Sequence, residues 1–240
     1  MPCRIKLIIK VTLTQTYTYS FLGTTATSPH KTMAYRLEYF DVRGRGESIR
    51  YLLKDNELVY DEVLIDFNDW PKYKPKMPYG QAPAFYSGDT MFVQSNSILR
   101  YLGRKHDMYP SDPVTAYQVD MLNDGVEDLR NLYVKLIYQN YDAGKEEYVK
   151  ALPERLQPFE NILKANGATS SGFAVGGKVS FVDYNLYDLL DIHVLLSPTC
   201  LDTLPTLKAY HNTFNSRPRL AAYRQTEAFK KRNVNGNGKQ

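Results

Sequence analysis

The chain has 240 residues, 43% of them hydrophobic, which is enough to bury a substantial core in one large domain or two modest ones. Its two cysteines, Cys3 and Cys200, are too few for a disulfide framework and show no zinc or redox-pair spacing, which indicates a reducing compartment. The formal net charge of +4 comes from the segment before Tyr35, which has basic residues and no acidic one. The remainder is near neutral, which argues against a nucleic-acid partner, and no apolar run reaches the roughly 18–20 residues of a membrane span.

The first 32 residues differ in composition from the rest. They are rich in threonine, basic and free of acids, which is typical of a targeting peptide, although Arg4 is their only arginine. Lys10 interrupts the apolar run at residues 7–13 and weakens the interpretation as a secretory signal. The remaining interpretation is an upstream leader, with Met33 as the functional start. Residues 1–32 are therefore treated as a leader or extension.

From residue 36 the pattern alternates between strand and helix. Residues 36–40 alternate like a short strand, residues 47–54 place apolar side chains at helical spacing, and residues 60–65 return to a strand. Residues 66–78 are rich in Pro and Lys, and we expect them to be irregular.

A hairpin and a helix come next. Strands at residues 84–86 and 91–94 flank a turn at Gly88-Asp89, and Ser95 occupies the N-cap position before an apolar stripe. A helix N-terminus offers free backbone N–H groups and the positive end of the dipole, which both suit a small carboxylate. Ala82 precedes Pro83 and is biased toward extended geometry, so its backbone could pair with a short peptide. If Pro83 is cis, we expect the surrounding fold to lock that isomer.

After a proline-containing linker at residues 107–113, no convincing strand remains. Apolar side chains between residues 119 and 136 alternate steps of three and four, which predicts one long amphipathic helix. Ser180 and Asp183 have capping-box spacing at the start of another helix. Helices are predicted at residues 153–164, 181–196, 204–215 and about 219–229.

Six segments resemble the Pi class of glutathione S-transferases: YFDVRGRG at 39–46, YGQAPAF at 79–85, QSNSILRYL at 94–102, NDGVEDLR at 123–130, SFVDY at 180–184 and NGNGKQ at 235–240. The resemblance covers roughly residues 34–240. It implies the cytosolic fold of that family, with an α/β thioredoxin-like, glutathione-binding domain at 34–112 and an all-α domain at 114–236. It also implies a homodimeric, cytoplasmic enzyme that conjugates the glutathione thiolate to hydrophobic electrophiles in detoxification. Glutathione is then a co-substrate, and neither a metal nor another cofactor is expected.

Tyr39 lies at the position of the family's catalytic tyrosine. Among 20 tyrosines, composition alone would make it a packing residue, and only the resemblance singles it out. A free thiol with a pKa of about 8.5 is mostly protonated at neutral pH, whereas attack on an electrophile needs the thiolate. A tyrosine O–H that donates to the sulfur favours the thiolate, and a fall of two pKa units needs about 2.7 kcal/mol.

The resemblance also assigns glutathione-binding roles to the residues around the turn and the helix start. Gln94 and Ser95 would hold the γ-glutamyl carboxylate, although Ser95 could equally be an ordinary N-cap. Gln81 and the Ala82 backbone, beside Pro83, would pair with the cysteinyl part of the peptide; the ordinary alternative is a simple turn.

Further glutathione contacts come from outside that turn. Trp70 and Lys74 would bind the glycine carboxylate, with Lys76 left open as an alternative to Lys74. Arg45 opens the first helix in this interpretation and steadies the tyrosine and the peptide, whereas Arg43 is expected to be structural.

An acidic row is formed by Asp120, Asp124 and Asp128, spaced four residues apart on the long helix. Neighbouring like charges repel, so a positive partner is expected, unless the row is a solvated face. The resemblance implies that Asp128 reaches across a dimer interface to the amino group of glutathione bound in the other subunit.

The electrophile pocket is expected to use Phe40, Val42, Val134 and Tyr138, which are apolar with one hydroxyl. Tyr138 could donate to a developing oxyanion, or could be a core residue. A glutathione-dependent isomerase or peroxidase would use the same peptide site, and a non-enzymatic binder of hydrophobic ligands is the competing class. Tyr39 favours an enzyme. A mitochondrial or secreted location follows only if residues 1–32 are a genuine targeting peptide.

Overall fold

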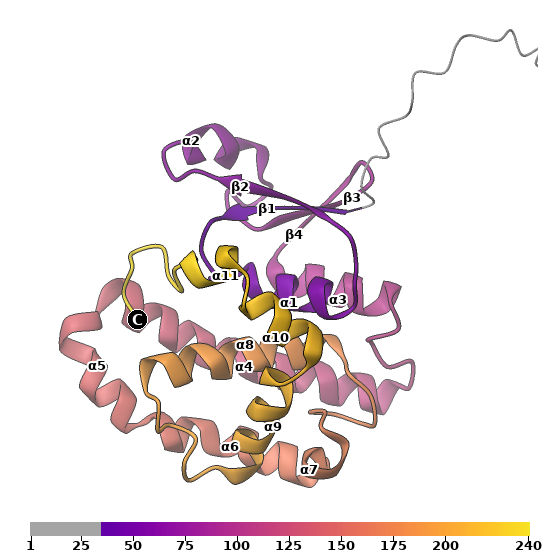
Figure 1. The fold of residues 1–240 in the computed structure, drawn as a ribbon, viewed down its shortest axis with the longest axis vertical. Coiled ribbons are helices and arrows are strands. Elements are labelled where there is room, and N and C mark those ends of the chain that lie inside the picture. The colour runs from indigo at the N-terminus through magenta and orange to yellow at the C-terminus, as the bar shows by residue number, and fades with distance from the viewer. Residues whose placement is uncertain (1–34) are drawn as a thin grey trace, which may run out of the picture. The chain divides into compact units, whose positions relative to one another are not determined.

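The computed structural model describes residues 35–240 and contains a four-stranded sheet (Figure 1). The strands are β1 (Tyr35–Phe40), β2 (Asp61–Ile65), β3 (Ala84–Ser87) and β4 (Thr90–Val93), in the order β2-β1-β3-β4. β1 pairs in parallel with β2 and antiparallel with β3, which forms the predicted hairpin with β4. The expectation that residues 1–32 are a leader lies outside the described residues.

Two helices cover one face of this sheet, between it and the helical part of the chain (Figure 1). They are α1 (Glu47–Asp55) and α3 (Ser95–Lys105), and both contact the central helix α8 (Phe181–Leu196). The β-α-β unit followed by β-β-α confirms the predicted thioredoxin-like arrangement. The segment expected to be irregular is partly helical, because prolines begin the short α2 (Trp70–Tyr73) and the 3-10 turn at Lys74–Lys76.

The rest of the described chain is helical, as predicted. The final predicted helix is split in two, because Thr226 turns out of the first piece and caps the second by accepting from the Phe229 N–H. A helix after the long α4 was not predicted, because only Tyr148 of that helix is buried and no apolar stripe marks it. The elements are α4 (Pro113–Gln139), α5 (Tyr141–Lys150), α6 (Leu152–Ala165), α7 (Ala168–Ser171), α8 (Phe181–Leu196), α9 (Pro205–Asn215), α10 (Pro218–Arg224) and α11 (Glu227–Lys231).

Helix α8 forms the centre of the helical part, and nearly all its residues are buried. It begins at the predicted capping box, where the Asp183 carboxylate accepts from the Ser180 backbone N–H at 2.7 Å. A helix that is buried all round must also satisfy its polar side chains. Those of α8 do so by pairing with residues of the sheet layer and of the surrounding helices α4, α5, α9 and α10.

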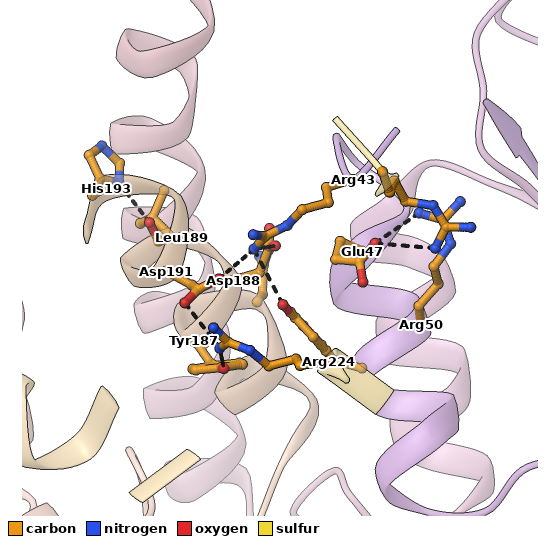
Figure 2. Close-up of polar contacts among 12 residues, drawn as sticks. Arg43, Glu47, Arg50, Tyr187, Asp188, Leu189, Asp191, His193 and Arg224 are labelled. Atoms are coloured by element: carbon orange, nitrogen blue, oxygen red, sulfur yellow. Dashed lines mark hydrogen bonds and ion pairs between the residues drawn. The ribbon is translucent and has the colours of Figure 1, made fainter. Parts of the chain in front are cut away.

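The paired charges are drawn in Figure 2. The buried Arg43 guanidinium lies 2.7 Å from Asp191 and 3.5 Å from Asp188, both on α8. Asp191 also contacts Arg224 at 3.1 Å, and Asp188 contacts Arg130 at 2.8 Å. Removing one charged side chain of this network would leave its partner buried without a counter-charge, which is strongly destabilising. The network therefore holds Arg43, and with it the end of β1, against the helical part. The structural role expected for Arg43 agrees with this geometry.

The described residues 35–240 form one compact unit in which the sheet layer and the helices are in contact. The predicted division at residues 112–114 falls just before α4, whose N-cap Asp112 accepts from the Thr115 N–H at 2.8 Å. That division stays a prediction. Within residues 35–240, no helix is long and apolar enough to cross a membrane.

Candidate active site

Tyr39 lies near the end of β1, with its ring buried against the turn that leads into α1. Its hydroxyl oxygen accepts a hydrogen bond of 2.8 Å from the Arg45 backbone N–H. No acceptor for the hydroxyl hydrogen is present in the part of the chain that the structure describes. The hydroxyl is therefore held by one bond and keeps its hydrogen free to donate.

Two glycines make room for this side chain. A Cβ on Gly44 would lie 2.5 Å from the Tyr39 hydroxyl, and a Cβ on Gly46 would lie 2.6 Å from its ring carbon Cδ1. Gly44 also has a φ of +41°, which favours glycine. Both glycines are needed for the close approach of this turn to the tyrosine, a role that sequence analysis missed.

The environment of Tyr39 keeps it protonated. Burial raises the pKa of its hydroxyl, and the opposing effects of the Arg45 N–H and the Arg50 guanidinium do not cancel this. A tyrosine with a raised pKa remains a phenol across the physiological range and acts as a hydrogen-bond donor.

A first cavity of about 450 Å³ opens beside this turn. It is lined by eight of the predicted site residues: Phe40, Arg45, Trp70, Gln81, Ala82, Pro83, Gln94 and Ser95. The Ala82–Pro83 peptide bond is cis, the isomer that sequence analysis considered. The cavity thus brings together residues that are far apart in the sequence.

The N-terminus of α3 faces the first cavity. Ser95 is the first residue of α3, so it is not the N-cap that sequence analysis expected; Gln94 holds that position. Gln94 has a φ of +68°, an uncommon value for a residue with a side chain, and no side chain caps α3 among the described residues. The first N–H groups of α3 therefore have no side-chain cap at the place where Ser95 and Asn96 line the cavity.

Aromatic and basic side chains border the other end of the first cavity. The Phe40 ring packs edge-on against Trp70, with centroids 5.2 Å apart, and stacks on Phe67 at 4.5 Å. Lys74 Cε lies 3.4 Å from where a Cβ on the cavity-lining Gly80 would be. Lys76 instead lies over the ring of Tyr73. The geometry therefore favours Lys74 over Lys76 at this cavity.

Arg45 connects the first cavity to a second one. It lies in the turn before α1, two residues short of the helix it was expected to open. Its guanidinium pairs with Glu127 of α4 and donates to Asn131 Oδ1 at 3.2 Å. Burial opposes ionisation of Glu127, but Arg130 and Arg45 outweigh it and lower the pKa of that carboxyl.

The second cavity, of about 240 Å³, lies on the Tyr39 side of Arg45. It is lined by Tyr39, Gly44, Arg45, Arg130, Tyr133, Val134, Tyr138, Ile192, Val234 and Asn235. Val134 and Tyr138 were predicted for an electrophile pocket, whereas Phe40 lies in the first cavity. Tyr138 is half-exposed, and its hydroxyl accepts from the Gly236 N–H at 3.0 Å.

The C-terminal tail forms one wall of the second cavity, which sequence analysis did not foresee. Asn235 donates to the Tyr133 hydroxyl at 2.7 Å. The tail carries no helical or strand periodicity that would have predicted its place. The resemblance of residues 235–240 to the family was the only signal there, and it did not indicate that the tail lines a cavity.

Three predicted site residues line neither cavity: Lys74, which lies beside the cavity-lining Gly80, Val42 and Asp128. Val42 is buried and pairs its backbone with Asn233, so it lines neither cavity. Asp128 is exposed on α4 and has no ion-pair partner among the described residues. The positive partner expected for the acidic row is Arg100 of α3, which lies 2.7 Å from Asp120 and 3.2 Å from Asp124.

No group of three or more His, Cys, Asp or Glu residues suited to a metal ion occurs between residues 35 and 240. The two adjoining cavities present a phenol, guanidinium groups and backbone donors.

The chain is similar to known proteins over most of its length. The family described as "Glutathione S-transferase, N-terminal domain" matches residues 35–104, and "Glutathione S-transferase, C-terminal domain" matches residues 127–227. Glutathione S-transferase P 1 of Bufo bufo is 49% identical over 208 residues, which are 86% of this chain and 99% of that protein. Glutathione S-transferase P of Homo sapiens is 47% identical with the same coverage.

Solved structures agree with these matches. The Pi-class glutathione S-transferase of Onchocerca volvulus has a TM-score of 0.84 and 38% identity, covering 87% of this chain and 100% of that one. The glutathione S-transferase from Ascaris lumbricoides has a TM-score of 0.71 and 29% identity, covering 81% and 98%.

Proposed function

The chain belongs to the glutathione S-transferase family, and we propose that its first cavity binds glutathione while its second cavity takes the electrophile. The Pi-class relatives confirm the family, the fold class and the glutathione transferase activity predicted from the sequence. We infer the residues that perform the reaction, and the assembly of the protein, from the geometry of the two cavities and of the exposed surface.

Tyr39 is the proposed catalytic residue, and the observation that carries the proposal is its hydroxyl. That hydroxyl accepts from the Arg45 N–H, keeps its own hydrogen free and has a raised pKa. A neutral phenol in this position donates to the sulfur of glutathione and stabilises the thiolate over the thiol. With the electrophile held in the adjoining cavity, the remaining contribution is proximity.

Glutathione is proposed to lie along the first cavity with a carboxylate at each end. The uncapped N-terminus of α3 at Gln94 and Ser95 suits the γ-glutamyl carboxylate. Trp70 and Lys74, at the other end, suit the glycine carboxylate. The extended backbone at Ala82, beside Gln81 and the cis Pro83, suits the cysteinyl part between them.

A homodimer in the cytoplasm is the proposed assembly. Val114, Tyr117 and Met121 lie on one face of α4 and are exposed, as is Tyr79 beside the first cavity. A second copy that covers this apolar face would also bring its own α4 close to the first cavity. The exposed, unpaired Asp128 is then available to the ammonium group of glutathione in the other subunit.

The Tyr39→Phe variant tests the proposed chemistry. We expect it to fold and to bind glutathione, yet to lose most conjugation at neutral pH, with a loss that shrinks at high pH where the thiol ionises unaided. A direct titration of the thiolate absorbance of bound glutathione should show a raised thiol pKa.

Tyr101→Phe is the matched control, because its hydroxyl contacts only Lys105 and lines neither cavity. Unchanged conjugation by Tyr39→Phe at neutral pH would remove Tyr39 from its role. It would also favour the alternative of a protein that only binds hydrophobic ligands.

A further inference from the structure

A third cavity lies between α4, α5 and α6 and has a volume of about 260 Å³. It shares no lining residue with either cavity at Tyr39. Leu132 and Leu136 supply an apolar wall, while Lys135, Arg155 and Glu147 supply the charged groups. The lining therefore carries two cations and one carboxylate, beside apolar surface.

Arg155 is the unusual member of this set. Its side chain is partly buried, with the guanidinium carbon 4.6 Å from the centre of the Tyr148 ring. Its Nη1 atom is buried and has no hydrogen-bond acceptor among the described residues. A buried charged donor without an acceptor is costly, so this atom marks a place where an acceptor belongs.

The neighbouring groups leave Nη1 without a hydrogen bond, although the Tyr148 hydroxyl also lies near the Arg155 guanidinium. The lone pair of His193 Nε2 is already used, because His193 Nδ1 donates to the Leu189 carbonyl at 2.7 Å and Nε2 accepts from the Tyr148 hydroxyl at 2.9 Å. Glu147 is exposed at the cavity and forms no ion pair in the described part of the chain. Arg155 lines the cavity, so its guanidinium is a cationic group that a ligand in the cavity would meet.

We propose that this third cavity binds a small organic carboxylate with an apolar body. The carboxylate accepts from the Arg155 fork, and Lys135 adds a second positive charge at the rim. The apolar body covers Leu132 and Leu136, of which Leu132 is 42% exposed in the free protein. The volume limits the ligand to about the size of a benzoate ion, below that of drug-sized molecules.

Titration with sodium benzoate, followed by NMR of leucine and valine methyl groups, tests this site. We expect saturable shifts at Leu132 and Leu136 and none at Val134 or Val234, which line the cavity at Tyr39. Because a hydrogen bond to a charged group is lost, Arg155→Gln should weaken binding at least about tenfold.

Two further variants separate a specific site from a general charge effect. Lys164→Gln removes one cation from the same helix, α6, but lines none of these cavities, and it should leave benzoate affinity unchanged. Glu147→Gln removes the carboxylate that repels the ligand and should tighten binding about two- to fivefold. Conjugation activity and thermal melting of each variant check that the fold is intact.

Three results would overturn the proposal. They are an absence of saturable shifts at Leu132 and Leu136, equal weakening by Arg155→Gln and Lys164→Gln, or shifts centred on Val134 and Val234. Inorganic phosphate supplies the charge without the apolar body and should bind more weakly than benzoate. Phosphate that binds as tightly as benzoate would refute the role of the leucine wall.

Discussion

Replacement of Gly44 by alanine should inactivate the enzyme by displacing a side chain that is not itself changed. The new Cβ would lie 2.5 Å from the Tyr39 hydroxyl, a distance that real Cβ contacts do not show, so one group must move. The Tyr39 ring has little room, because it is buried and Gly46 also lies against its Cδ1–Cε1 edge. We expect the hydroxyl to leave its bond with the Arg45 N–H.

The size of the expected loss of activity depends on how far Tyr39 lowers the pKa of the glutathione thiol. If Tyr39 lowers the pKa of the glutathione thiol by about two units, its displacement costs about 2.7 kcal/mol, or up to roughly a hundredfold in kcat/KM near pH 6.5. The loss should fade above the ordinary thiol pKa of about 8.5. A pH series of conjugation rates with the variant and the parent protein measures both.

Gly88→Ala is the matched control for backbone strain. Gly88 also has a positive φ, +58°, but a Cβ there would meet no atom within 4 Å. Both variants should lose roughly 1–2 kcal/mol of stability from the left-handed backbone, and only Gly44→Ala should lose activity.

The double variant completes the test. In a Tyr39→Phe background the hydroxyl that meets the new Cβ is absent, so Gly44→Ala should change kcat/KM far less than in the parent. Full activity of Gly44→Ala, or equal effects in the two backgrounds, would refute the reasoning.

Two other predictions concern the dimer and the pH dependence of stability. Asp128→Asn should weaken glutathione binding by about 1.5–3 kcal/mol if the site is dry. In a mixed dimer with one Asp128→Asn subunit and one Tyr39→Phe subunit, the site that keeps Tyr39 should conjugate with a near parental KM for glutathione; conjugation only with a raised KM would contradict action across the interface. Burial lowers the pKa of His193 to about 4, so the unfolded chain binds the proton more readily. Stability from this residue should be complete above pH 6.5 and fall by up to roughly 3 kcal/mol by pH 4, as measured by urea unfolding, and a His193→Gln variant that kept this slope would disprove the assignment.

Local signals in the sequence were enough to predict much of the fold. The helix Phe181–Leu196 begins and ends where predicted, because a capping box marks its start and nothing inside interrupts it. Helix α5 escaped prediction because its stability comes from packing around one buried residue, Tyr148, and not from a periodic stripe.

The candidate site was harder to derive, because its geometry depends on contacts between distant residues. No local pattern indicates that Gly44 must lie against Tyr39, or that Arg43 finds its partner Asp191 on a helix 148 residues away. Val42 was expected in the electrophile pocket but lines neither cavity, for the same reason: its backbone pairs with Asn233, and this contact between distant residues leaves no local pattern in the sequence. Motif resemblance supplied the lining of the first cavity, which periodicity alone could not.

The turn that aims Tyr39 is hydrogen-bonded to residues near the end of the chain. The Arg43 N–H donates to the Asn233 carbonyl at 2.8 Å, and the Gly44 N–H donates to the Val234 carbonyl at 3.0 Å. During synthesis Tyr39 therefore leaves the ribosome long before the two carbonyl groups that support its turn. A chain interrupted before Asn233 possesses every residue that lines the first cavity and yet lacks the finished turn, so we expect it to be inactive.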